Sequence, residues 1–272
     1  MTVIKGGVAV ITGAASGIGA SLATEFAERG AALALADIDA DGLADVREAV
    51  ASYGVDCSLH EVDVGDRTAI ASFAAAVEAE HGRASVLVNN AGVSHIGSAE
   101  DTSVEDFEWL MQINFWGVVN SCSAFLPMLR RESDAHIVNL SSLFGLVAVP
   151  LQSAYNASKF AVRGYTEALR MELEESNVGV TCVHPGGVLT PIARRARISE
   201  GVDGAMHDKL ASLFETRAMT TPQQAASQIA RGVEKNRKRL LIGPDARLID
   251  KIARLLPTGY DRVLGLRKLL GD

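Results

Sequence analysis

Cysteine is scarce in this sequence, and the cysteines that occur are not placed for a structural role. The chain of 272 residues contains 3 of them, Cys57, Cys122 and Cys182, which are odd in number and widely spaced. A disulfide framework needs paired cysteines, and a zinc site needs closely spaced ligands such as a CxxC pair. We therefore predict neither a disulfide nor a metal site, and we expect the cysteines to be buried apolar residues.

The sequence also lacks a long uninterrupted apolar run. A membrane-spanning helix needs roughly 18 or more such residues, and no segment approaches that length. The first residues, MTVIKGGVAVITG, lead directly into a glycine-rich motif without the charged and apolar regions of an export signal. These absences predict a cytoplasmic protein.

Positive charge is deficient overall. The formal net charge is -7, whereas nucleic-acid-binding proteins carry a basic surface, so we predict no nucleic-acid partner. The charge is uneven, however. Residues 231–272 hold 11 Lys/Arg against 5 Asp/Glu, a net +6, which leaves -13 on residues 1–230. This asymmetry sets the C-terminal segment apart.

Short apolar runs alternate with segments of helical length along most of the chain. This pattern is typical of a parallel sheet covered by helices on both faces, within a single α/β domain. The alternation lapses between Leu189 and about Thr221, and we interpret residues 189–221 as a lid over the strand ends. The seven expected strands lie at residues 8–12, 31–37, 58–64, 85–92, 136–142, 178–186 and 239–243.

The segment VAVITGAASGIGASLATEFAERG reads as a strand, a glycine turn and a helix, with Gly13, Gly17 and Gly19 in the turn. Glycine allows a tight turn and lets backbone N–H groups approach a pyrophosphate at the positive end of a helix that begins near Ser16. The alternative is that the glycines serve only close packing of strand and helix. The order of strand, turn and helix favours a dinucleotide site.

An acidic residue follows at the distance that such a site requires. Asp37 ends the second expected strand, 18 residues after Gly19. A carboxylate there accepts hydrogen bonds from the adenosine ribose hydroxyls but faces the 2′-phosphate of NADP at close range. Two negative groups within about 4 Å repel by roughly 4 kcal/mol at an effective dielectric of 20. The sequence therefore predicts NAD, the alternative being that Asp37 is only a solvated surface residue.

Tyr155 and Lys159 lie four residues apart in SAYNASKFAV, so on a helix they share a face. A free phenol has a pKa near 10 and is a poor base at neutral pH. Lowering that pKa by three units takes about 4 kcal/mol, which one cation at about 4 Å supplies at intermediate dielectric. Without context, such a pair is more often a solvated helix face.

The context of this pair is a set of polar residues at strand ends or on flanking helices. Ser142 lies thirteen residues before Tyr155, and Asn114 lies in MQINFWGV, an expected amphipathic helix. The motif NNAG spans residues 89–92, and HPGGVLT spans 184–190. Open α/β sheets bind ligands at this edge. With TGxxxGIG, NNAG, Asn, Ser and YxxxK in order from about Val8 to Gly243, the chain closely resembles the short-chain dehydrogenase/reductase family.

This resemblance implies a Rossmann-like doubly wound sheet and hydride transfer between a nicotinamide and a carbonyl or secondary alcohol. Tyr155 is then the general acid/base, and Lys159 lowers its pKa and binds the nicotinamide ribose. Ser142, preferred over Ser141 on spacing, hydrogen-bonds the substrate oxygen. Asn114 holds a water that links Lys159 to solvent, or else it is a helix kink or a polar core residue.

The resemblance also implies which residues contact NAD. It places the adenine edge near Asp63 and Val64 and the nicotinamide amide near Val188 and Thr190. The implied cofactor contacts are Gly13, Ser16, Gly17, Ile18, Gly19, Asp37, Asp63, Val64, Asn90, Ala91, Gly92, Tyr155, Lys159, Pro185, Gly186, Val188 and Thr190.

The expected substrate pocket is mostly apolar. Its candidate residues are Ser94, His95, residues 143–151, Gly186, Gly187 and the lid. An apolar pocket with one polar focus favours a lipophilic or small aliphatic secondary alcohol or ketone. Three lid residues, Arg194, Arg195 and Arg197, leave an acidic substrate open as an alternative to solvated lid charges.

Residues 244–272 form a basic, amphipathic extension beyond the catalytic domain of residues 1–243. An apolar stripe of Leu248, Ile249, Ile252, Leu255 and Leu256 has Arg247, Lys251 and Arg254 beside it. The stripe packs against a partner subunit, covers the substrate mouth or lies on an anionic membrane surface. The resemblance implies a homodimer or homotetramer paired through the helices that hold Asn114 and Tyr155.

Three functions therefore compete. The first is an NAD-dependent alcohol dehydrogenase or ketone reductase. The second is an NADP-dependent carbonyl reductase, which Asp37 disfavours, as does Ser16 where a basic residue would be expected. The third is a non-catalytic NAD-binding redox sensor, which the presence of Asn114, Ser142, Tyr155 and Lys159 together disfavours.

Overall fold

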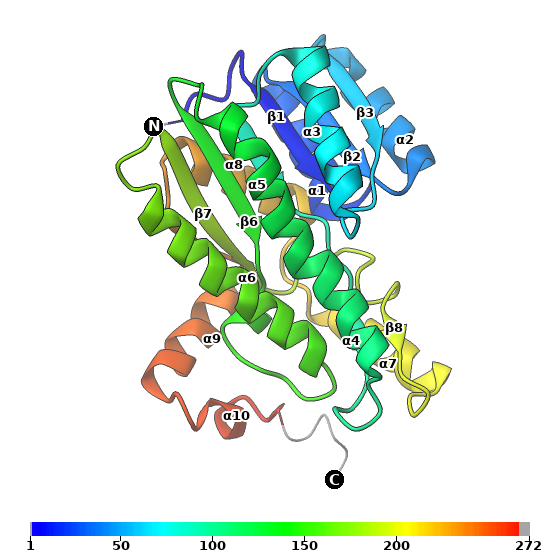
Figure 1. Cartoon of the computed structure of the whole chain (residues 1–272). Coiled ribbons are helices and arrows are strands. Elements are labelled where there is room, and N and C mark those ends of the chain that lie inside the picture. The colour runs from blue at the N-terminus through cyan, green and yellow to red at the C-terminus, as the bar shows by residue number, and fades with distance from the viewer. Residues whose placement is uncertain (1, 267–272) are drawn as a thin grey trace.

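The computed structural model describes residues 2–266 of the chain. Its centre is a parallel sheet of seven strands in the order β3-β2-β1-β4-β6-β7-β9 (Figure 1). The strands are β1 (Val8–Thr12), β2 (Ala32–Asp37), β3 (Cys57–Glu61), β4 (Val86–Asn89), β6 (Ala135–Leu140), β7 (Val178–Pro185) and β9 (Arg239–Ile242). The predicted single α/β domain with a doubly wound sheet of seven strands is confirmed.

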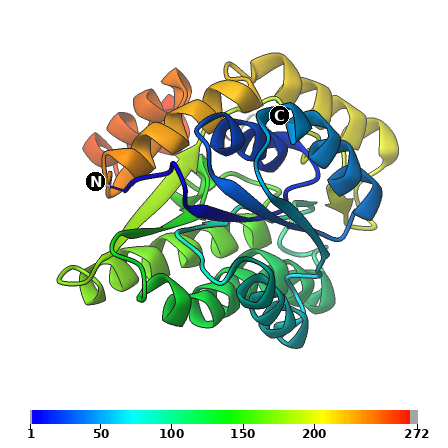
Figure 2. The ribbon, with the colours of Figure 1, turned by 90° about the horizontal axis from the view of Figure 1, so that it is seen from above.

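Helices cover both faces of this sheet, as the view from above shows (Figure 2). One face carries α1 (Gly17–Glu28), α2 (Ala40–Val50) and α8 (Pro222–Glu234), whose buried residues form one apolar cluster with the strands. The other face carries α3 (Arg67–His81), α5 (Gly117–Leu129) and α6 (Ser153–Glu172), which form a second cluster. The strand order reverses between β1 and β4, so a crevice opens at their carboxyl ends.

Shorter elements surround this frame. They are a 3₁₀ turn η1 (Ala51–Tyr53), β5 (His95–Ile96), α4 (Val104–Met111), a π-helical turn η2 (Gln112–Trp116), a 3₁₀ turn η3 (Leu143–Gly145), β8 (Arg197–Ile198), α7 (Gly204–Arg217), α9 (Pro244–Leu255) and α10 (Tyr260–Val263). No helix within residues 2–266 has the length and apolar character needed to cross a membrane.

The expected lid, residues 189–221, is more regular than its sequence predicts. It contains the helix α7, which Asp203 caps, and β8, which pairs in parallel with β5. The prediction of a long irregular segment is wrong here, because α7 packs only Leu210 on a small cluster of Ile96, Ala196 and Val202 and so shows a weak helical pattern in sequence. Only Ala211 of this helix is buried, while Leu210, Leu213 and Phe214 line a cavity, so the helix carries little of the usual amphipathic pattern.

The C-terminal extension does not present the single apolar stripe that we expected. Ile249 packs against a cluster of Leu143, Leu146, Val147 and Ala246, whereas three members of the expected stripe are exposed: Leu248 (60%), Leu255 (80%) and Leu256 (45%). The packed face of α9 consists of Ala246, Ile249 and Ala253. Residues 267–272 of the extension lie outside the described residues.

Candidate active site

A cavity of about 760 Å³ runs along the carboxyl ends of the central strands. The motifs that the sequence singled out meet there, because parallel strands all end at the same edge of a sheet. The cavity is lined by the predicted residues Gly13, Ser16, Gly17, Ile18, Asp37, Asp63, Val64, Asn90, Ala91, Gly92, Ser142, Tyr155, Lys159, Pro185, Gly186, Val188 and Thr190. Two predicted residues, Gly19 and Asn114, are outside its wall.

The glycine turn leaves no space for a side chain at Gly13 or Gly19. Gly13 has a φ of +66°, and a β-carbon there would lie 2.7 Å from the Cα of Ala91. A β-carbon on Gly19 would lie 2.0 Å from the Gly13 carbonyl oxygen. Gly19 therefore lets α1 pack closely on the turn. It does not line the cavity, although we predicted that it contacts the cofactor. The Asn90 amide donates to the Thr12 carbonyl at 3.0 Å and the Gly13 carbonyl at 2.9 Å.

Asp37 is oriented by the backbone around it. Its carboxylate accepts hydrogen bonds from Ala15 N at 2.9 Å and Asp39 N at 3.1 Å. The neighbouring cavity wall consists of residues 37–39 and 62–64, which include three carboxylates and no lysine or arginine. The glycine turn, the backbone N–H groups at the start of α1 and the oriented carboxylate of Asp37 fit a nicotinamide adenine dinucleotide.

Asn114 lies in the π-helical turn between α4 and α5 rather than in a regular helix. Its Oδ1 accepts from Val93 N at 2.8 Å, and its Nδ2 donates to the Val93 carbonyl at 2.9 Å and the Ser158 hydroxyl at 3.1 Å. The side chain is fully buried and ties α5 and α6 to the turn after β4. Both the kink and the polar core residue are therefore present, and the water-holding role stays a prediction.

Tyr155 and Lys159 lie on α6 and line the cavity together, as their spacing predicts. Both are buried, with exposed fractions of 9% and 4%. The Lys159 amine donates to the Leu140 carbonyl at 3.1 Å and lies 5.7 Å from the centre of the Tyr155 ring. A β-carbon on Gly92 would lie 3.3 Å from this amine, so a side chain at this position of the turn after β4 would crowd it.

Burial dominates the ionisation of both groups. Desolvation raises the pKa of Tyr155 to about 12, although a hydrogen bond with the Ser142 side chain acts to lower it. Desolvation also lowers the pKa of Lys159 to about 8. The lowered tyrosine pKa that we expected is therefore absent from the protein alone, because a buried phenolate loses more solvation than its surroundings return.

Ser142 and Ser141 follow β6 and play different roles. The Ser141 hydroxyl donates to the Lys159 carbonyl at 2.8 Å, which fixes it against the backbone of α6. The Ser142 hydroxyl accepts from Phe144 N at 3.1 Å and interacts with Tyr155. The spacing argument that preferred Ser142 thus agrees with the geometry.

The substrate end differs from prediction at His95. Its neighbours Ser94 and Ile96 line the cavity, but His95 itself is buried beneath, with Nε2 3.4 Å from the Ser199 hydroxyl and 3.8 Å from an Asp106 oxygen. Burial lowers the pKa of this histidine. His95, a pocket candidate for which a loop histidine without function was the alternative, therefore does not line the cavity, and it lies in β5, which pairs with β8.

The lid arginines divide into two kinds. Arg194 pairs with Glu215, and Arg197 stacks on Trp109 at 3.6 Å from the ring centre while it contacts Asp106. Both are occupied in holding the lid. Arg195 alone of the three candidates lines the cavity.

Several cavity residues escaped sequence reasoning. Gln152 and Leu266 line the cavity without having been predicted, whereas the α7 residues that form one wall lie within the predicted lid, and Ile249 belongs to the predicted stripe of the extension. Asp245, at the start of α9, accepts a hydrogen bond from Gly187 N at 2.6 Å. Two adjacent glycines in HPGG were the available signal, since a β-carbon on Gly186 would lie 2.3 Å from the Asp245 carboxylate.

Comparison with known proteins agrees with this site. The sequence profile of the short chain dehydrogenases matches residues 7–201. The oxidoreductase SadH of Mycobacterium tuberculosis is 45% identical over 267 residues, which cover 97% of this chain and 96% of SadH.

Two solved structures show the same fold. A short-chain dehydrogenase/reductase from Burkholderia phymatum, in complex with NAD, has a TM-score of 0.87 and 28% identity over 94% of this chain and 96% of its own. An alcohol dehydrogenase from Thermococcus sibiricus, complexed with 5-hydroxy-NADP, has a TM-score of 0.74 and 25% identity over 87% of this chain and 95% of its own. The chain therefore belongs to the short-chain dehydrogenase/reductase family of oxidoreductases.

Proposed function

We propose that this protein is an NAD-dependent oxidoreductase that interconverts a secondary alcohol and its ketone. The observation that carries the proposal is the convergence of Ser142, Tyr155 and Lys159 on the same cavity as the glycine turn and Asp37. One end of the cavity thus offers a dinucleotide site, and the other offers a proton-exchanging hydroxyl beside a hydrogen-bonding serine.

Bound NAD supplies the hydride acceptor, and its nicotinamide brings a positive charge to the site. In the oxidation direction Tyr155 takes the proton of the alcohol, and in the reduction direction it returns that proton to the ketone oxygen. The Ser142 hydroxyl holds the same oxygen. Lys159 would hold the nicotinamide ribose, and its ammonium would add to the charge that makes a phenolate accessible despite a starting pKa of about 12.

The residues at the adenosine end favour NAD over NADP. Solved relatives bind either cofactor, so the chain's own residues must decide. The backbone holds Asp37 in an orientation from which it would meet ribose hydroxyls, and among residues 2–266 no lysine or arginine lines the cavity beside it to accept a 2′-phosphate. The repulsion between a carboxylate and that phosphate supports NAD.

The walls beyond Tyr155 favour a lipophilic or aliphatic substrate. They consist largely of apolar side chains from the segment after β6, from α7 and from the C-terminal extension: Leu143, Phe144, Val149, Leu210, Leu213, Phe214 and Ile249. Such walls gain affinity by burying hydrocarbon and leave recognition of the reacting oxygen to Ser142 and Tyr155.

Of the three roles left open for the C-terminal extension, we favour covering the substrate mouth. Ile249 and Leu266 line the cavity, and the hydroxyl of Tyr260 accepts a hydrogen bond from Ala148 N at 3.1 Å. Together with the contact of Asp245 on Gly187, this anchors the extension to both loops that border the substrate.

We also propose that the protein is a homo-oligomer, as the family resemblance implies. The helices that would pair expose large apolar side chains, Trp116 (47%), Phe160 (40%) and Met171 (62%). Size-exclusion chromatography with light scattering tests this, and a monomer would contradict it.

The proposed activity is tested with a panel of secondary alcohols that includes steroids, diols and hydroxy fatty acyl compounds. Each is incubated with NAD or NADP, and reduced nicotinamide is followed by its absorbance. We expect turnover with NAD for at least one lipophilic or aliphatic alcohol. No turnover of any alcohol, or of the matching ketones with NADH, would overturn the proposal.

A further inference from the structure

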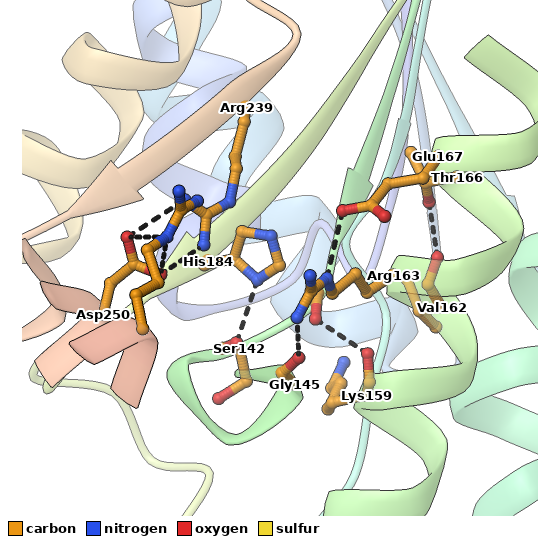
Figure 3. A network of polar contacts seen from close by, with 12 residues as sticks. Ser142, Gly145, Lys159, Val162, Arg163, Thr166, Glu167, His184, Arg239 and Asp250 are labelled. Carbon is orange, nitrogen blue, oxygen red and sulfur yellow. Dashed lines mark hydrogen bonds and ion pairs between the residues drawn. The ribbon is translucent and has the colours of Figure 1, made fainter. Parts of the chain in front are cut away.

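His184 lies directly behind the catalytic segment, and no role in catalysis has yet been given to it. It is the next-to-last residue of β7 and is fully buried. Its ring points at the backbone carbonyl of Ser142, with Nδ1 3.1 Å from that oxygen (Figure 3). Since a carbonyl only accepts hydrogen bonds, Nδ1 carries the proton and Nε2 is unprotonated.

The surroundings of the ring favour this neutral form. Burial lowers the pKa of His184 to about 4, and Arg163 and Arg239 add positive charge nearby. Figure 3 shows the ring between these two arginines, each paired with an acid: Arg163 with Glu167 at 3.0 Å and Arg239 with Asp250 at 2.6 Å. Glu167 acts in the opposite direction and favours the charged imidazole, but burial outweighs it and keeps the pKa low.

Nε2 of His184 makes no hydrogen bond to the rest of the described chain. A buried polar atom without a partner is unfavourable for folding, so Nε2 gives no reason for a histidine at this position. The contact that it does make is with the residue whose hydroxyl faces Tyr155. We therefore look for the effect of His184 on the position of Ser142.

The Ser142 carbonyl is held from two sides. Gly145 N donates to it at 3.0 Å from within η3, and His184 Nδ1 donates from β7. The η3 contact is local and moves with the turn, whereas β7 is a central strand paired with β6 and β9. Ser141 N already donates to the Val183 carbonyl of β7 at 2.9 Å, and the histidine adds a side-chain tie from the same strand to Ser142 itself.

We propose that His184 is a positioning residue, which fixes the backbone of Ser142 and thereby aims its hydroxyl at the substrate oxygen and Tyr155. This inference rests on the proposed oxidoreductase function. If the Ser142 hydroxyl is misoriented, its hydrogen bond to the substrate oxygen is weakened in the transition state. We therefore expect kcat to fall while cofactor binding persists.

Two amide replacements separate this role from simple packing. The Nδ2 of asparagine in His184→Asn occupies nearly the place of histidine Nδ1 and still donates to Ser142. In His184→Gln the side-chain amide nitrogen occupies the place of Nε2 instead. The Ser142 carbonyl then loses its donor from β7 and keeps only Gly145 N. We expect kcat to fall about tenfold in H184Q, the effect of one hydrogen bond, and less than about threefold in H184N. KM for NAD should stay within about twofold in both.

A second buried histidine supplies the matched control. His136 lies near the start of β6, at the opposite end of this strand from Ser142, and is fully buried. Its Nε2 lies 2.7 Å from the Thr181 hydroxyl. His136→Asn and His136→Gln should lower Tm yet leave kcat unchanged. Equal kcat in H184N and H184Q, with both proteins folded and binding NADH, would overturn the positioning role while the proposed function stands.

A measurement without turnover distinguishes failure of this inference from failure of the function. Long-range proton–nitrogen NMR of the histidine-labelled wild type reports which ring nitrogen of each histidine carries the proton, and H184N identifies the signal. We expect a neutral ring protonated at Nδ1 at pH 7. A ring protonated at Nε2 would overturn the proposal even if no alcohol is turned over.

Discussion

The Lys159 amine lies 5.7 Å from the centre of the Tyr155 ring, and both side chains are buried in the same wall of the cavity. Burial disfavours the charged form of each, so the pKa of the lysine falls to about 8 and that of the tyrosine rises to about 12. In the protein alone the site therefore carries an electrostatic cost. A bound positive nicotinamide beside the ring would lower the energy of the phenolate.

Replacing Lys159 with methionine should stabilise the fold and abolish activity. A pKa lowered from 10.5 to about 8 corresponds to roughly 3 kcal/mol of unfavourable burial at pH 7. The variant relieves this but leaves the Leu140 carbonyl without a donor, at a cost of about 1–2 kcal/mol. Thermal unfolding should thus show a Tm a few degrees higher. Lys251→Met, on the exposed face of α9, should leave Tm nearly unchanged.

The advantage of Lys159→Met should depend on pH in a defined direction. Between the folded pKa of about 8 and the unfolded value near 10.5, the unfolded wild type binds more protons than the folded one, so wild-type stability rises with pH. The methionine variant has no such dependence. Its advantage should be complete below pH 8 and disappear by about pH 10.5. An advantage that grows with pH would show that the lysine is not buried as a cation.

Asp37 should control the choice between NAD and NADP. In Asp37→Ser combined with Ile38→Arg, the repelling carboxylate is removed and a cation is placed on the exposed neighbouring side chain. We expect the ratio of kcat/KM for NADP to that for NAD to rise about a hundredfold or more. Glu61→Gln is the matched control, since Glu61 pairs in register with Asp37 but lies outside the cavity. A similar shift in that variant would point to general electrostatics rather than the ribose contact.

Asp245 should govern the loop at Gly187 through the hydrogen bond that its carboxylate accepts. Asp245→Ala removes the acceptor and opens space beside Gly186, and we expect kcat/KM for the alcohol to fall about tenfold. Asp245→Asn keeps an acceptor oxygen and should lose less than about threefold. Steady-state kinetics with saturating NAD make the comparison. Equal losses in the two variants would mean that the charge, rather than the hydrogen bond, is what the loop requires.

Substitutions of Ile249 and Leu255 test whether the C-terminal extension covers the cavity of its own chain. Ile249 lines the cavity and packs on the segment after β6, whereas Leu255 is 80% exposed. Ile249→Ala should lower stability by about 2 kcal/mol and broaden the substrate range. Leu255→Ala should change stability by less than about 0.5 kcal/mol.

The membrane alternative for the extension has its own readout. Flotation of the full chain with anionic liposomes should match that of the combined variant Leu248→Ser and Leu255→Ser, because we assign the extension to the substrate mouth. Flotation that is lost in the double variant would favour the membrane role instead.

The sequence predicted those parts of the site that local pattern and sheet topology determine. The glycine turn, Asp37, Ser142 and the pair on α6 each follow from a short motif, and parallel strands then bring the motifs to one edge. Helix and strand periodicity likewise placed all seven strands of the central sheet.

The parts that sequence reasoning missed depend on tertiary contacts. His184 meets a backbone carbonyl, which no residue type reveals, and Asp245 meets Gly187 only because β9 pairs with β7. The apolar residues of α7 face a cavity instead of a core, so their pattern is weak. The raised pKa of Tyr155 reflects burial, which spacing along a helix does not report.

Exchange of Tyr155 for phenylalanine tests the central claim most directly. Kinetics with an alcohol that the wild type oxidises, together with fluorescence titration of NADH, separate chemistry from cofactor binding. The account predicts that turnover collapses by at least about a thousandfold, since the proton-exchanging group is gone, while NADH affinity stays within about threefold. Turnover that survives the loss of this hydroxyl would contradict the assignment of Tyr155 as the acid/base.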